Sequence, residues 1–134
     1  MRTAARLIGH IPKFGHVTAF MRDVLHWLPI PQRIVYRLSA LVWRCLLGSA
    51  PVYLQELCRS TLDVQGRRAL RSSTHGELLV PRARTALRQL RAFSVVWNGL
   101  PLILRAIPRV HLDAFYSNLK TILFSRGWVG SAPE

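Results

Sequence analysis

PQRIVYRLSALVWRCLL, residues 31–47, carries the strongest helical signal in the chain. Pro31 suits a first helical turn, and Gly48 stands where a helix commonly ends. Apolar residues recur at the spacing of one helical face, and that face comprises Ile34, Leu38, Leu41, Val42, Cys45 and Leu46. The segment therefore predicts a helix that packs this face on a core and leaves Val35, Tyr36 and Trp43 outside it.

Two weaker helical segments flank this one. Before it, Thr18 can cap a helix that runs to Leu28, where Pro29 stops it. The apolar face of that helix comprises Phe20, Met21, Val24, Leu25 and Leu28. After it, Ala50 and Pro51 start a short helix whose inward residues are expected to be Tyr53, Leu54 and Leu57.

The last helix is predicted from Leu112 to Ser125, and Gly127 is expected to end it. Asp113 stands near its N-terminus, where the helix dipole favours a negative charge. Its apolar face comprises Leu112, Phe115, Leu119 and Ile122 or Leu123.

An arginine-rich insertion, residues 59–97, separates the third helix from the last. Short apolar runs at residues 78–80 and 92–97 are compatible with two strands of a hairpin. The expected fold is mainly α, with three or four helices around one small core and a short arginine-rich β-hairpin or irregular insertion. Residues 1–128 are expected to form a single domain, and residues 129–134 a frayed tail.

Composition sets the broad class. The chain has 134 residues, of which 50% are hydrophobic, so it can build the core of one domain. Nineteen Lys and Arg against six Asp and Glu give a net charge of +13, which favours a polyanionic partner and argues against a carboxylate-rich active site. No uninterrupted apolar stretch approaches the roughly 20 residues of a membrane span.

The reactive side chains predict neither catalysis nor a bound metal or other cofactor. No two acids lie at helical spacing, which leaves no pair to hold catalytic cations, and the histidines form no metal-binding motif. Cys45 and Cys58 form no Cys-x-x-Cys pair, and Cys45 is expected to be a buried free thiol in a reduced, nuclear or cytoplasmic protein. The amino terminus is basic, but Gly9, Pro12 and Gly15 interrupt an amphipathic helix, which argues against mitochondrial import.

The arginines of the insertion are the candidate binding residues. A guanidinium group suits bidentate contact with phosphate, so these side chains could hold the backbone of RNA or DNA. The candidates are Arg67, Arg68, Arg71, Arg82, Arg84, Arg88 and Arg91. Trp43 and Trp97 lie among apolar neighbours and are expected to pack in the core rather than stack on bases.

Thirteen short motifs follow one another in an order that resembles one family, over roughly residues 4–126. They are Ala4-Ala5-Arg6-Leu7-Ile8, His16-Val17-Thr18, Arg22-Asp23, His26-Trp27-Leu28-Pro29, Gln32-Arg33-Ile34, Gly48-Ser49-Ala50-Pro51, Tyr53-Leu54, Leu70-Arg71-Ser72, Val80-Pro81-Arg82, Arg84-Thr85, Arg91-Ala92-Phe93-Ser94, Trp97-Asn98-Gly99-Leu100-Pro101 and Leu119-Lys120-Thr121. The chain resembles the C-terminal segment that follows the reverse transcriptase core in the polyprotein of LINE-type (non-LTR) retrotransposons.

The resemblance implies an accessory, non-enzymatic role that supports the polymerase and holds element RNA or target DNA. The family's polymerase motif, Tyr/Phe-x-Asp-Asp, and its endonuclease region lie upstream of this segment, and neither is in this sequence. The chain departs from the family at Gly15 and Ala19, and it has only two residues between Ser94 and Trp97 where the family has several more. That shortening is expected to pull Trp97 out of its packing register.

Three functions remain open from the sequence. The chain could be a fragment that binds RNA or DNA through the phosphate backbone. It could instead be a protein-interaction module that once packed against the reverse transcriptase core and now self-associates through exposed apolar surface, to which Val35, Tyr36 and Trp43 would contribute. The third possibility is a retrotransposon-derived open reading frame without a selected molecular function.

Overall fold

The computed structural model describes residues 1–63, 76–80, 93–110 and 112–129. Within these ranges the protein is mainly helical and contains no strand, which confirms the predicted fold class. Seven α-helices and one 3-10 turn are present in the described residues: α1 (Arg2–Gly9), α2 (Thr18–Asp23), α3 (Ile30–Leu46), α4 (Val52–Gln55), η1 (Thr61–Asp63), α6 (Phe93–Asn98), α7 (Leu102–Arg105) and α8 (Leu112–Trp128).

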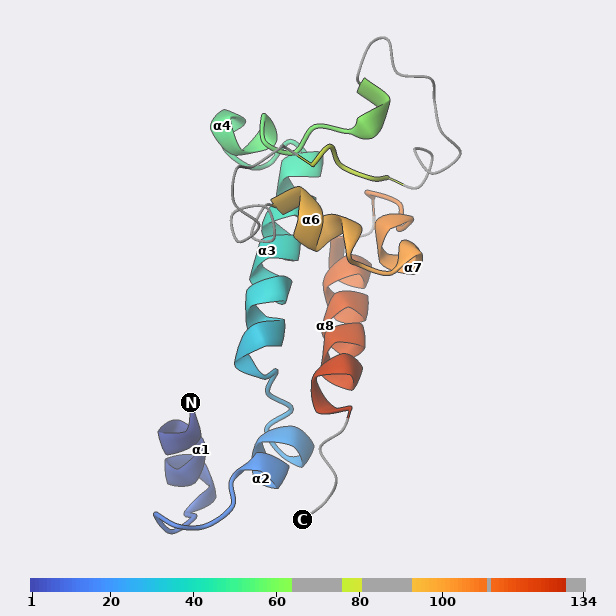
Figure 1. Cartoon of the computed structure of the whole chain (residues 1–134). Coiled ribbons are helices and arrows are strands. Elements are labelled where there is room, and N and C mark those ends of the chain that lie inside the picture. The colour runs from blue at the N-terminus through green and yellow to red at the C-terminus, as the bar shows by residue number, and fades with distance from the viewer. Residues whose placement is uncertain (64–75, 81–92, 111, 130–134) are drawn as a thin grey trace.

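The two long helices, α3 and α8, run antiparallel and side by side, and α6 packs near the C-terminal end of α3 (Figure 1). Three aromatic rings join these helices. Trp43 of α3 stacks on Phe115 of α8 with ring centroids 4.1 Å apart, and Trp97 of α6 lies 6.2 Å from Trp43. This cluster, with Leu104 and Leu119, forms the centre of the main core.

The buried face of α3 differs from the predicted one. Val42 and Cys45 are buried as expected, and Trp43, only 1% exposed, is confirmed as a core residue. Trp43 lies off the predicted face, however, whereas Ile34 of that face is 55% exposed. Val35 and Tyr36, expected outside the face, pack against the core. The buried side of α3 carries Trp43, whose ring meets Phe115 of α8, and the small, fully buried Ser39.

The predicted strand at residues 92–97 is wrong, because residues 93–98 form α6. Only an isolated antiparallel bridge joins Leu78 to Ser60. The side chain of Asn98 accepts from the N–H of Leu78 at 2.9 Å and donates to its carbonyl at 2.8 Å. These side-chain bonds satisfy the backbone of the buried Leu78 where a partner strand would otherwise be needed.

Trp97 is not displaced by the shortened segment that precedes it. Its side chain is 1% exposed, and its indole N–H donates to the carbonyl of Gly76 at 2.9 Å. The short span between Ser94 and Trp97 lies within the single helix α6, which carries Ser94 and Trp97 into the core together. The expected loss of packing register is therefore wrong.

The ends of several helices also depart from prediction. The glycine at position 9 does not prevent a helix, because α1 runs to Gly9 and ends at His10, which has a positive φ of 50°. α2 stops at Asp23, five residues before Leu28, although Leu28 is buried. α8 continues through Gly127, where an added Cβ would come within 3.1 Å of the Gln32 side chain, so this glycine serves close packing.

Further differences concern smaller elements. On α4 and just beyond it, Tyr53 and Leu57 are exposed, and only Leu54 of the three predicted inward residues packs against the core. α7 was not expected from the sequence, yet its Leu104 is fully buried. Beside α1 and α2, a second small cluster is built around Ala5, Val17 and Met21, so the described residues form two apolar clusters rather than one.

None of the described helices is long and apolar enough to cross a membrane.

Candidate anion-binding pocket

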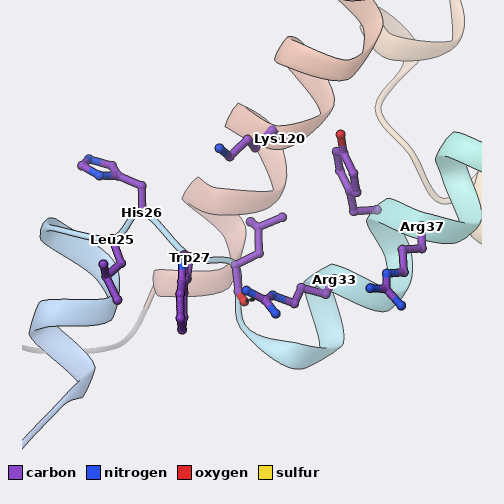
Figure 2. A pocket seen from close by; sticks show the side chains of 8 residues that line it. Leu25, His26, Trp27, Arg33, Arg37 and Lys120 are labelled. Carbon is purple, nitrogen blue, oxygen red and sulfur yellow. Dashed lines mark hydrogen bonds between the residues drawn. The ribbon is translucent and has the colours of Figure 1, made fainter. Parts of the chain in front are cut away.

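A pocket of about 440 Å³ lies between the α2–α3 connection, the first turns of α3 and the middle of α8 (Figure 2). It combines aromatic and cationic side chains, which are Leu25, His26, Trp27, Leu28, Arg33, Tyr36, Arg37 and Lys120. No acidic residue is among these described lining residues. An anion is therefore the ligand that its electrostatics favour.

The connection between α2 and α3 builds one wall of the pocket. His26 adopts a positive φ of 48°, a conformation in which histidine is more common than most residues. Its ring nitrogen Nδ1 lies 3.2 Å from the Val24 carbonyl, and the ring stacks on Phe124 of α8 at 5.8 Å. Leu28 is buried in the main core, so this short segment is fixed at both ends.

Arg33 is hydrogen-bonded through its Nε, and its two terminal guanidinium nitrogens are available to a ligand. Its Nε donates to the carbonyl of Leu28 at 3.0 Å, and its guanidinium lies 5.5 Å from the centroid of the Trp27 ring. The two terminal nitrogens make no hydrogen bond to any described residue. A guanidinium oriented in this way can present two parallel N–H donors to an oxyanion at little entropic cost.

Two further cations complete the charge of the pocket. Arg37 lies one turn after Arg33 on α3, and Lys120 extends from α8 on the other side of the opening (Figure 2). Both side chains are exposed, so they keep their hydration until a ligand binds. Three positive charges around one hollow concentrate the local potential more than the same charges spread over a flat surface.

Two acids of the described residues form ion pairs with arginines that do not line the pocket. Asp23 accepts from Arg22 at 2.6 Å, and this hydrogen bond lowers the pKa of the Asp23 carboxyl below its ordinary value. Glu77 pairs with Arg105 at 3.5 Å, at the other end of the protein. The carboxylate of Asp23 is thus compensated by its own neighbour, and the pocket cations face solvent.

The seven arginines predicted to bind nucleic acid do not lie in this pocket. Arg67, Arg68, Arg71, Arg82, Arg84, Arg88 and Arg91 all lie outside the described residues. Sequence reasoning missed Arg33, Arg37 and Lys120 as a group, because they come from two helices far apart in the chain. One feature of the sequence could have indicated part of the site. Trp27 and Arg33 flank Pro29 and Pro31, and these prolines indicate a helix start close to both residues.

The cysteines form no part of this site. Both are buried and free, which confirms the predicted state of Cys45. Burial, together with the nearby thiol of Cys45, raises the pKa of Cys58 to about 12. Among the described residues, no group of three or more His, Cys, Asp or Glu side chains could hold a metal ion.

The chain matches no protein-family model, no curated protein and no solved structure. The resemblance to the segment that follows the reverse transcriptase core therefore stays a prediction from the sequence.

Proposed function

We propose that the chain is a non-enzymatic, retrotransposon-derived module that binds RNA or DNA through the phosphate backbone, in the nucleus or cytoplasm. The observation that carries this proposal is the pocket that Arg33, Arg37 and Lys120 line together with no lining carboxylate among the described residues. The net charge of +13 supports it, because a strongly basic protein attracts nucleic acid over long distances. The seven candidate arginines of the insertion lie outside the described residues, and their contact with phosphate stays a separate prediction from the sequence.

A pair of double variants tests this proposal. Arg37→Gln with Lys120→Gln removes two charges from the pocket, one on α3 and one on α8. Arg44→Gln with Arg126→Gln removes two exposed charges from the same two helices outside the pocket. Both variants have the same net charge, so any difference between them reports position rather than total charge.

Fluorescence anisotropy with a labelled 20-nucleotide single strand, measured over a range of salt, gives the result. The pocket variant should bind at least about tenfold more weakly, because each charged hydrogen bond contributes about 1.5–3 kcal/mol. Its slope of log affinity against log salt should fall by about 1.4, the value for two lost phosphate contacts. Equal losses in the two variants would overturn the proposal and favour a chain without a selected function.

A protein-interaction role is the second candidate, and it now rests on different residues. Val35, Tyr36 and Trp43, which suggested it, belong to the core, but Val52, Tyr53 and Leu57 are exposed on and beside α4. Such a patch can support self-association. Sedimentation at rising concentration should then show dimers that Tyr53→Ser with Leu57→Ser abolishes, and a monomer at every concentration would exclude self-association.

A further inference from the structure

We propose that the pocket holds one unpaired nucleotide, with its base against the Trp27–Arg33 stack and its phosphate on Arg33, Arg37 and Lys120. The protein then prefers single strands to duplexes. This inference rests on the proposed function, because it names the form of nucleic acid that the same site takes.

The size and walls of the pocket fit one nucleotide. Its volume of about 440 Å³ lies in the roughly 300–1,000 Å³ range of small-molecule sites. Trp27 and Tyr36 are both half-buried, so each ring is anchored by packing and still reaches the opening. A nucleotide needs a flat apolar surface for its base and cations for its phosphate, and the pocket contains both.

The Trp27–Arg33 stack supplies that flat surface. The guanidinium of Arg33 lies over the indole of Trp27, 5.5 Å from the ring centroid, and its Nε donates to the Leu28 carbonyl at 3.0 Å. Nucleobases stack on both indole and guanidinium planes, with little regard to base identity. A base added to this stack would continue it, which predicts tolerance of sequence rather than recognition of one base.

The cations lie where the phosphate of a stacked nucleotide would reach. Arg33 lies beside Trp27, Arg37 follows one turn later on α3, and Lys120 lies on α8 at the other side of the opening (Figure 2). A duplex cannot use this arrangement, because its bases are stacked inside the helix. Only its phosphates would meet the cations, and the aromatic surface would contribute nothing.

Three ligands of equal length test the inference on the unaltered protein. They are single-stranded dT12, a 12-unit abasic strand that keeps the phosphates without bases, and a 12-base-pair duplex. Binding to dT12 should be about tenfold tighter than to the abasic strand or the duplex. A parallel measurement with U12 distinguishes RNA from DNA as the source of the nucleotide.

The intrinsic fluorescence of tryptophan gives an independent readout. Trp43 and Trp97 are buried in the core, and the half-buried Trp128 does not line this pocket. Quenching by dT12 that arises at the pocket should therefore come from Trp27, and Trp27→Phe should remove that part of the signal. Trp27→Leu should abolish the difference in affinity between dT12 and the abasic strand. Near-UV circular dichroism verifies that both variants keep their core.

The outcomes separate this inference from the function on which it rests. Equal affinity for dT12 and the abasic strand would overturn the stacked base. Backbone binding would still stand if the Arg37/Lys120 variant bound more weakly than its Arg44/Arg126 control. Equal losses in those two double variants for every ligand overturn phosphate binding at the pocket, which carries the proposed function. Binding of a polyglutamate peptide as tight as that of dT12 also overturns the stacked base.

Discussion

Tryptophan serves two different purposes at two places in this protein. In the core, Trp43 stacks on Phe115 with their planes 6° apart and is closed off from solvent by apolar neighbours. At the pocket, Trp27 stacks under Arg33 and stays partly open. An aromatic partner and full burial make the first ring structural, whereas a cationic partner and an open side make the second available to a ligand.

The largest expected effect is on the core side of this comparison. Phe115→Ala removes the ring that contacts Trp43, Trp97 and Tyr116, and it should lower the free energy of unfolding by about 3–5 kcal/mol. Trp27→Leu should cost only about 1 kcal/mol, because that ring is half-buried. Urea melts measure the free energy of unfolding of both variants. Equal losses of stability in Phe115→Ala and Trp27→Leu would contradict the distinction between the core and the pocket.

A smaller effect concerns pH and the buried thiol of the core. The pKa of Cys58 is raised from 9.0 to about 12, so between these values the folded protein keeps a proton that the unfolded chain releases. The contribution of this thiol to the free energy of unfolding should therefore be constant below pH 9 and fall as the pH rises from 9 towards 12. Urea melts at pH 8 and 10.5 measure the fall.

Cys58→Ala is the control for that measurement, since the lysines and tyrosines also titrate in this range. The variant should lose stability less steeply than the parent protein between pH 8 and 10.5. Parallel slopes in the two proteins would contradict the raised pKa of the Cys58 thiol.

The smallest effect tests which face of α3 is buried. Ile34→Gln replaces an exposed side chain and should change the free energy of unfolding by no more than about 0.5 kcal/mol. Val42→Ala, on the buried face of the same helix, should cost clearly more. A loss of about 2 kcal/mol or more in Ile34→Gln would show that Ile34 is buried, as the face predicted from the sequence requires.

Local patterns predicted the two long helices well. Proline and apolar spacing placed α3 within one residue at each end, and α8 began where Leu112 indicated. Which side of α3 is buried could not be read in this way, because Ile34 and Trp43 are both apolar and lie on different faces. The choice depends on Phe115, which is distant in sequence, and α6 was mistaken for a strand because it is rich in valine and aromatic residues.

The candidate site was less accessible to sequence reasoning than the fold. Arg33 and Arg37 resemble solvated residues of an amphipathic helix until α8 brings Lys120 to face them. The stack of Trp27 under Arg33 further depends on the left-handed backbone of His26, which no helical periodicity indicates. Residues that meet only through tertiary packing cannot be grouped from spacing alone.

The most direct test of this account is the salt dependence of single-strand binding by the two double variants of equal charge. The account predicts that Arg37→Gln with Lys120→Gln lowers the slope of log affinity against log salt by about 1.4, whereas Arg44→Gln with Arg126→Gln leaves it unchanged. Identical slopes and affinities for the two variants would contradict it, because binding would then follow total charge and owe nothing to the pocket.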